Sequence, residues 1–309
     1  MSKDLSDALA KLLTEQRNPA SIAMDSLSVE EILRLINDQD KRVALAVEHE
    51  IPWIAKGVEL IVESFRRGGR LIYFGAGTSG RLGVVDASEC PPTFGTPPEL
   101  VVGVISGGQS AMFKSVEGAE DDPELARHDV DALNVNELDT VCGIAASRRT
   151  PYVVAAVAHA RALGAKTLYV TTNPRKDFDL EVDVAICPEV GPEVLMGSTR
   201  MKSGTAQKLV LNMLTTTSMV RLGKVYENMM VDLQLTNQKL VERSKRIVMM
   251  ATGIDYDGAT IALENAGGHV KSAIVMVKAG VSLDEARRRI DAAGGFVRGA
   301  IAGSSSPGA

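Results

Sequence analysis

Three segments of the chain combine glycine with hydroxyl side chains at a spacing that suits the binding of an anion. The first, Gly75–Arg81, reads Gly-Ala-Gly-Thr-Ser-Gly-Arg and joins an apolar run to an amphipathic one. Glycine lets the backbone turn tightly, and the start of a helix offers unpaired N–H donors and a positive dipole end. Gly77, Thr78 and Ser79 are therefore candidate anion-binding residues, with an ordinary strand-to-helix turn as the alternative.

The same segment carries the G-x-G-x-x-G spacing of dinucleotide-binding folds. In those folds an acidic residue is expected about 20 residues later, at the end of the second strand. Here Ser106-Gly-Gly108 ends that strand. The sequence therefore favours an isolated anionic group over a dinucleotide.

The second segment, Ala145–Thr150, also follows a predicted strand and precedes a predicted helix. Its candidate ligands are Ser147 and Thr150, which stand three residues apart and could equally cap the helix. Because ligands of open α/β sheets bind at the carboxyl ends of the strands, the first two segments are expected to meet there.

The third segment, Gly197–Thr205, opens a long apolar helix. Its candidate binding residues are Ser198 and Thr199. Two basic residues, Arg200 and Lys202, accompany them. The alternative is a capped helix whose basic side chains are solvated.

Two groups of acidic residues could supply general acid and base catalysis. Glu89 lies just ahead of Pro91-Pro92, and Cys90, directly before a proline, is biased away from helical conformation. The sequence thus predicts Glu89 at a helix end or in a loop near the first anion segment. A solvated surface charge is the alternative for each glutamate.

Glu120 belongs to the second acidic group, within Glu117–Asp122. This group is expected to end a helix over 109–119 that begins after Gly108. Acidic side chains at a helix C-terminus oppose the helix dipole. Their placement therefore indicates a functional reason for the glutamate.

The elements that must position these residues follow from alternating short apolar and longer amphipathic runs. The short runs are rich in β-branched residues, as in strands covered on both faces, and the alternation predicts an α/β fold with a parallel sheet. Strands are predicted at Leu71–Phe74, Val101–Ile105, Thr140–Ala145, Thr167–Thr171 and Val182–Ile186, and helices at 52–67, 80–87, 109–119, 124–133 and 151–163.

The flanking regions are expected to be helical. Ser28 and Glu31 have the spacing of a capping box, which places a helix in an N-terminal arm over 1–51. The sheet domain is expected over 52–224 and a helical region over 225–309. The helices predicted in these later parts are Thr199–Leu222, Asn228–Met250, 256–265, 269–278 and 282–293.

The composition excludes several classes of protein. Hydrophobic residues make up 45% of the chain, which is typical of a globular protein, and the formal net charge of −5 gives no basic surface for nucleic acid. No apolar run has transmembrane length and the N-terminus lacks a signal-peptide core, so a cytoplasmic location is expected. Neither a metal site nor a disulfide framework is indicated by the scattered histidines and cysteines: His49, His128, His159, His269, Cys90, Cys142 and Cys187.

At these motifs the sequence resembles the N-acetylmuramic acid 6-phosphate etherases, a family with the sugar isomerase (SIS) fold. Its Asp-Ala-Ser-Glu-Cys-Pro-Pro-Thr segment is specific to the etherases, whereas the Ser-Thr-Arg-Met-Lys segment is partly shared with glucokinase-regulatory relatives. The resemblance covers Asn37–Lys41, Leu71–Gly83, Asp86–Gly95, Val116–Asp121, Gly197–Lys208 and Met229–Asp232.

The resemblance implies a three-layer, flavodoxin-like SIS domain and a lyase of peptidoglycan recycling. Such an enzyme uses water to remove D-lactate from N-acetylmuramate 6-phosphate, without a metal or organic cofactor, as a homodimer with sites near the subunit interface. Glu89 would protonate the departing lactyl oxygen, and Glu120 would be the partner acid or base. Ser79, Ser147 and Thr150 match the phosphate loops.

One position departs from the family pattern. Arg148 stands where the pattern has glycine, so the backbone approach to phosphate or the local charge would differ at the second segment.

Two alternatives share the predicted fold. A sugar-phosphate isomerase would abstract the same C2 proton but needs no acid for an ether oxygen. A non-catalytic sugar-phosphate sensor would bind without turnover, although the glucokinase-regulatory relatives have two SIS domains and this chain has room for one.

Overall fold

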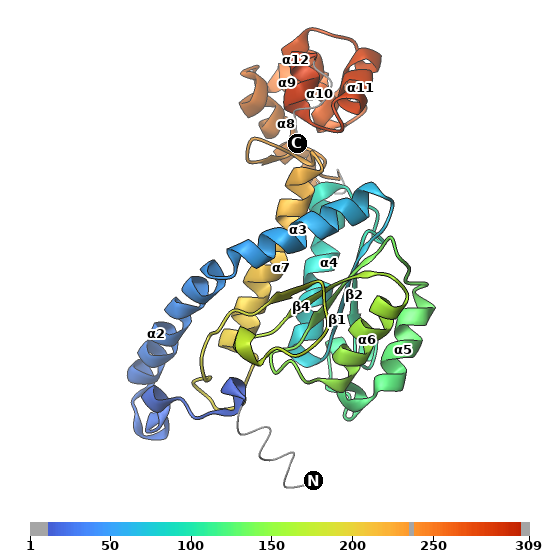
Figure 1. Ribbon diagram of the computed structural model, residues 1–309. Coiled ribbons are helices and arrows are strands. Elements are labelled where there is room, and N and C mark those ends of the chain that lie inside the picture. The colour runs from blue at the N-terminus through green and yellow to red at the C-terminus, as the bar shows by residue number, and fades with distance from the viewer. Residues whose placement is uncertain (1–11, 235–237, 304–309) are drawn as a thin grey trace. The chain divides into compact units, whose positions relative to one another are not determined.

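The computed structural model describes residues 12–234 and 238–303, which form two compact units (Figure 1). The first unit runs to Ser88 and continues over Glu99–Thr215, and the second combines Glu89–Pro98 with the chain from Thr216 onward. The expected division at residues 51 and 224 remains a prediction.

A five-stranded parallel sheet forms the centre of the first unit. The strand order is β2-β1-β3-β4-β5, so the order reverses between β1 and β3, where open α/β sheets bind ligands. Every residue of β1 and β3 is buried, as the apolar sequence runs predicted. The strands are β1 (Leu71–Gly75), β2 (Val101–Ile105), β3 (Thr140–Ile144), β4 (Lys166–Val170) and β5 (Val184–Ile186), which confirms all five predicted strands to within two residues.

Helices cover both faces of this sheet, which confirms the three-layer α/β fold. Helices α5 (Pro123–Ala132) and α6 (Pro151–Ala162) pack on one face through a shared apolar cluster that includes Phe74 and Tyr152. Helix α3 (Ile51–Arg66) packs on the other face against β1, β3 and β5.

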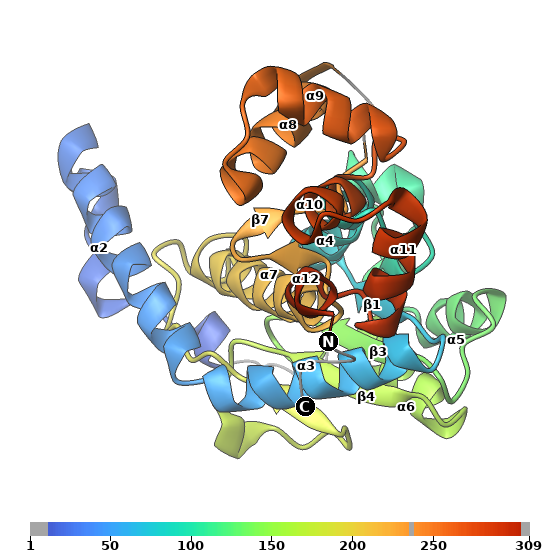
Figure 2. The same cartoon turned by 90° about the horizontal axis from the view of Figure 1, so that it is seen from above.

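Over its described residues, 12–50, the arm that precedes α3 is helical, as expected, and residues 1–11 of the predicted arm lie outside the described residues. Helix α2 (Val29–Glu48) begins with the predicted capping box, in which Ser28 and Glu31 bond to each other's backbone N–H groups. Figures 1 and 2 both show α2 extending away from the sheet of its unit, and only Gln39, Val43 and Val47 are buried along it.

The helix after β1 is longer than the prediction of 80–87. Helix α4 spans Gly77–Phe94 and contains Pro91 and Pro92, so the expectation that Cys90 leaves the helical region is wrong. Each proline lacks the N–H that would bond to the carbonyl four residues earlier, so the end of α4 forgoes two helical bonds, but both prolines lie in the last turn and no further turn has to continue past them. The Pro91 carbonyl still accepts from the Gly95 N–H at 2.9 Å.

The helix predicted over 109–119 is also wrong. Two short 3-10 turns, Gln109–Met112 and Ala119–Asp121, occupy this region, because Gly108 and Gly118 have φ values of +70° and +75° that interrupt a helix. Asp122 caps α5 by accepting from the N–H groups of Glu124 and Leu125. The acidic group therefore precedes a helix start, where the dipole favours it, and does not end a helix.

Over its described residues the second unit is helical with one small hairpin. The start of the predicted helix over Asn228–Met250 is instead β7 (Met229–Met230), which pairs with β6 (Val225–Tyr226) through a turn that has Glu227 at φ +55°. Residues 235–237 of that predicted helix lie outside the described residues. The helices predicted over 256–265, 269–278 and 282–293 are confirmed. The helices after the hairpin are α8 (Gln238–Thr252), α9 (Tyr256–Asn265), α10 (Val270–Ala279), α11 (Leu283–Ala292) and α12 (Val297–Ala302).

Within residues 12–234 and 238–303, no helix combines the length and the apolar character needed to cross a bilayer.

A partly buried ion cluster forms around Asp232 in the second unit, and Lys271 is its buried member. Its Oδ2 lies 2.8 Å from the Lys271 Nζ and 3.1 Å from the Lys224 Nζ, and its Oδ1 lies 3.5 Å from the His269 Nε2. Burial acts to raise the pKa of Asp232, but the bonds from His269 and Lys271 and the charge of Lys224 outweigh it and lower the pKa to about 2.

A strained residue follows β3. Arg148 adopts the left-handed region at φ +61°, which explains why glycine suits this position. Its guanidinium pairs with Asp179, and its carbonyl accepts from the Tyr169 hydroxyl at 3.2 Å.

We expect Asp232→Asn to lower the unfolding free energy at neutral pH by about 3 kcal/mol, because the buried Lys271 ammonium loses its partner. The folded-state pKa lies below the unfolded value, so the carboxylate stabilises the fold above about pH 4 and loses this effect as the pH falls toward 2. Urea unfolding at pH 7, 4 and 3 should show that the difference in unfolding free energy between wild type and Asp232→Asn becomes smaller as the pH falls. Asp291→Asn, an exposed change in the same unit, is the control. A difference that does not depend on pH would contradict this explanation.

We expect Arg148→Gly to be more stable than Arg148→Ala by about 1 kcal/mol. Both variants lose the ion pair with Asp179, but only alanine keeps a Cβ in the left-handed region. Chemical denaturation of the two variants measures the difference directly. Equal stabilities would show that this backbone conformation is not strained.

Candidate functional site

The turn after β1 leaves no room for side chains at two of its glycines. A Cβ at Gly75 would lie 2.6 Å from the Gly80 backbone nitrogen, and one at Gly80 would lie 2.6 Å from the Gly75 carbonyl oxygen. The close approach starts α4 at Gly77, whose φ is +53° and which is exposed. The first N–H groups of α4 therefore lie at the carboxyl edge of the sheet, in the position expected for binding an anion.

The two hydroxyl residues of this turn lie against α7 (Lys202–Arg221). The Thr78 Cγ2 is 3.3 Å from the position of a Cβ at Gly204. The buried Ser79 hydroxyl donates to the Gln207 Oε1 at 2.9 Å. In this arrangement Ser79 links the first segment to the third, and its backbone N–H remains part of the helix start.

The second segment is fixed by the residues that follow β4. The Ala146 carbonyl accepts from the Thr171 hydroxyl and from the Asn173 side-chain nitrogen, each at 2.8 Å. Ser147 accepts from the Arg149 N–H at 3.4 Å. Thr150 is the N-cap residue of α6, and its side chain makes no capping bond.

The third segment begins α7 with a cap that the sequence did not indicate. The fully buried carboxylate of Glu193 accepts from the N–H groups of Lys202 at 3.0 Å and Ser203 at 2.9 Å. Ser198 and Thr199 lie in the preceding turn and are partly exposed. The hydroxyls of these two residues therefore do not serve as the helix cap.

Lys202 is buried, so the interpretation of solvated basic side chains is wrong for this residue. Its Nζ donates to the Val190 carbonyl at 2.8 Å and to the Gln39 Oε1 at 3.1 Å. Desolvation lowers the pKa of Lys202, and the charge of Glu193 opposes this effect.

Thr172, which follows β4, connects the second segment to the third. The Thr172 hydroxyl donates to the Ser203 hydroxyl at 2.9 Å, and Thr172 also reaches the Ala146 carbonyl through its N–H at 3.2 Å. Since Ser79 already reaches Gln207, the structure brings the three predicted anion segments together around the start of α7.

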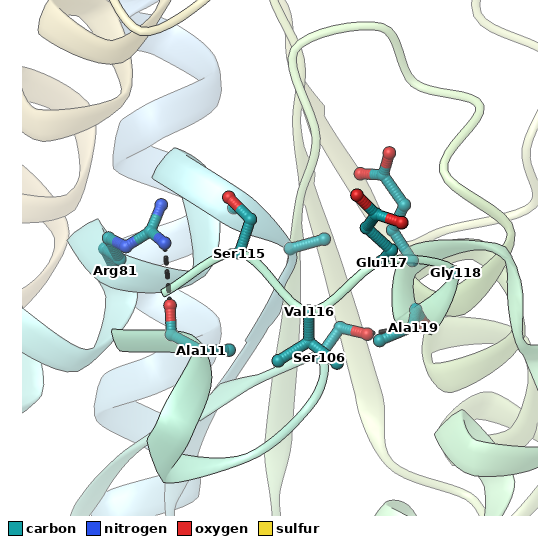
Figure 3. Close-up of a pocket in the computed structure, with 11 residues that line it drawn as sticks. Arg81, Ser106, Ala111, Ser115, Val116, Glu117, Gly118 and Ala119 are labelled. Carbon is teal, nitrogen blue, oxygen red and sulfur yellow. Dashed lines mark hydrogen bonds between the residues drawn. The ribbon is translucent and has the colours of Figure 1, made fainter. Parts of the chain in front are cut away.

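A pocket of about 300 Å³ opens beside the first segment (Figure 3). It lies between the turn after β1 and the loop after β2, so Glu120 shares it with Gly77. The residues that line the pocket are Ala76, Gly77, Arg81, Ser106, Ala111, Ser115, Val116, Glu117, Gly118, Ala119 and Glu120.

Two side chains fix the loop that carries the acidic residues. The Arg81 guanidinium donates to the carbonyls of Ala111 at 2.7 Å and Met112 at 3.0 Å. The Ser106 hydroxyl donates to the Ala119 carbonyl at 2.6 Å, next to Glu120. Figure 3 shows the side chains of Arg81 and Glu117 on opposite sides of the pocket.

The other proposed acid, Glu89, is exposed on α4 and is the first residue of the second unit, whereas Glu120 lies in the first. Three residues before it, the buried Asp86 accepts from Asn212 at 2.8 Å and from the Tyr73 hydroxyl at 3.0 Å. Burial raises the pKa of Asp86, and these bonds lower it. Asp86 therefore anchors α4 to α7 and β1.

Sequence reasoning missed Arg81, Ser106 and Glu117 as members of the pocket. Each had a signal in the sequence, because Arg81 ends the first glycine segment, Ser106 directly follows the strand β2 and Glu117 stands three residues before Glu120. The helix wrongly predicted over 109–119 concealed that these residues line one pocket. A helix there would not have brought the loop after β2 next to the turn after β1.

The chain matches the model of the glucokinase regulatory protein N-terminal SIS domain over residues 53–161 and that of the SIS domain over 112–217. The sheet domain is thus an SIS domain, as the resemblance implied.

Curated relatives of the chain bear the name N-acetylmuramic acid 6-phosphate etherase. The protein from Salinibacter ruber is 64% identical over 88% of both chains. Those from Symbiobacterium thermophilum and Photorhabdus laumondii are 59% and 56% identical, each over 86% of this chain and 88% of the relative. Identity of this extent shows that the chain belongs to the N-acetylmuramic acid 6-phosphate etherase family.

Proposed function

We propose that the protein cleaves the lactyl ether of N-acetylmuramate 6-phosphate with water, giving N-acetylglucosamine 6-phosphate and D-lactate. The observation that carries the proposal is the identity of 64% to an etherase over 88% of both chains. The pocket that joins an anion-binding turn to a glutamate suits a phosphorylated substrate and proton transfer.

The chemistry needs one group that removes a proton and one that supplies a proton. The C2–H of the sugar is acidic when C1 is an aldehyde, so the open-chain form reacts. A base takes the C2 proton, the C2–H electron pair forms the C2=C3 bond, and the C3–O bond breaks. An acid protonates the departing lactyl oxygen. Water then adds at C3 and a proton returns to C2, which balances the overall hydrolysis.

We assign these roles to two glutamates. Glu120 is the base at C2, and its support is the pocket that it shares with Gly77. Glu89 is the acid for the lactyl oxygen, and its support is the match of its motif to the etherases. Two carboxyl groups can divide such work when one is neutral and the other ionised.

The phosphate end of the substrate is assigned to the three anion segments. Backbone N–H groups at helix starts and neutral hydroxyls can bind a dianion, although the protein as a whole is acidic. Anchoring this end would orient C2 and C3 toward the acids. The proposed binding residues are Gly77, Thr78, Ser79, Ser147, Thr150, Ser198 and Thr199.

Two further features belong to the same proposal. We expect a homodimer with its sites near the subunit interface, and we expect the protein to act in the cytoplasm on a soluble sugar phosphate.

We expect Glu89→Gln to reduce D-lactate release by a factor of about 10² or more, because glutamine cannot protonate the ether oxygen. Exchange of the C2 hydrogen with solvent should persist, since the base remains. Lactate is measured enzymatically and exchange by NMR in D₂O. Glu124→Gln, an exposed change in α5, should retain both activities. Loss of exchange in Glu89→Gln would remove Glu89 from a role confined to the leaving group.

We expect Glu120→Gln to abolish both C2 exchange and lactate release, because no proton is removed from C2. The same two assays measure it, and the difference from Glu89→Gln separates base from acid. Full exchange in Glu120→Gln would exclude this residue as the base. Wild-type protein that interconverts sugar phosphates without releasing lactate would indicate an isomerase.

A further inference from the structure

Arg81 is the single cation among the described residues that line the pocket, and two carboxylates, Glu117 and Glu120, share the pocket with it. Its guanidinium bonds to the Ala111 carbonyl through NH2 and to the Met112 carbonyl through Nε. A guanidinium has five N–H groups, so the NH1 end keeps two donors that no described protein atom accepts. The arginine is therefore held in place and still offers donors to a ligand.

The proposed substrate carries two anionic groups at opposite ends of the sugar. The phosphate on C6 is assigned above to neutral hydroxyl and N–H donors, and the lactyl group on C3 carries a carboxylate. Glu120 must lie near C2 to act as the base, so the lactyl carboxylate must lie in the same pocket. Two glutamates would repel this carboxylate unless a cation offsets them.

We propose that Arg81 binds the lactyl carboxylate and so selects sugar phosphates that carry the ether substituent. The inference rests on the proposed etherase function and adds the recognition of the leaving group. The planar guanidinium suits this role, because it forms charge-assisted bonds to a carboxylate. The bonds to Ala111 and Met112 fix its direction before the substrate arrives, which reduces the entropy lost on binding.

Substrate and product give a direct test, because they share the phosphate and the sugar but only the substrate carries the lactyl group. For Arg81→Gln we expect kcat/KM for N-acetylmuramate 6-phosphate to fall by about tenfold to a hundredfold through a higher KM. The inhibition constant of N-acetylglucosamine 6-phosphate should stay within about twofold of wild type. Arg81→Lys keeps the positive charge but lacks the planar pair of N–H donors. Its KM should lie between those of wild type and Arg81→Gln.

Arg161→Gln is the matched control, because it removes an arginine from the same unit that pairs with Glu181 and Asp183 away from the pocket lining. It should leave both constants unchanged. Equal weakening of substrate and product in Arg81→Gln would overturn the proposal and indicate a general role in shaping the pocket. A lower kcat with both affinities unchanged would also overturn it, and would make Arg81 a positioning residue for the loop. Failure of the proposed function itself is recognised separately, by wild-type protein that releases no D-lactate.

Discussion

The buried carboxylate of Glu193 is the interaction on which the carboxyl edge of the sheet depends. Its two oxygens accept the N–H groups of Lys202 and Ser203, at the helix start where the dipole favours negative charge. The Lys202 ammonium is buried in the same region and bonds to Gln39 and Val190. Because a buried carboxylate is costly unless its oxygens accept hydrogen bonds, the two N–H groups that satisfy Glu193 fix where α7 begins.

From that point, hydrogen bonds extend to the surrounding segments. Gln39 of the N-terminal arm also accepts from Asn18 at 2.9 Å, and the Asn18 side chain donates to the Pro192 carbonyl at 3.0 Å, which attaches the arm. Ser203 accepts from Thr172, and Thr172 holds the Ala146 carbonyl of the second segment. Several hydroxyl and amide groups near the proposed site are therefore engaged in holding these segments in place. In the proposed site, the donors left for an anion include the backbone N–H groups at the helix starts.

The sequence was sufficient to predict the sheet, because buried parallel strands are short apolar runs with clear boundaries. It also identified the glycine turn after β1 and placed Glu120 among the candidates. Prediction from the sequence failed where contacts with residues far along the chain override the local structural preference of a segment. Pro91 and Pro92 remain in the last turn of α4 although each lacks a helical N–H, and the buried Lys202 ammonium has Gln39 and the Val190 carbonyl as hydrogen-bond partners.

The prediction for the loop after β2 was wrong for a different reason. Its residues 109–119 have helical composition, but Gly108 and Gly118 take positive φ values that a periodicity argument does not register. The members of the pocket that were missed all depend on this loop or on its anchors, Arg81 and Ser106. The site was therefore predicted as separate motifs, and its pocket was not.

The contact between Gly75 and Gly80 has a consequence for the history of the protein. Each backbone occupies the space that a side chain at the other position would need, and a Cβ at Gly80 would also lie 2.7 Å from the Ile105 Cγ1. Any substitution at one position is blocked by the main chain of the other, so a compensating second substitution cannot relieve it. Replacement of either glycine during evolution would therefore require a different backbone conformation at this turn. Changes in side chains alone could not accommodate it.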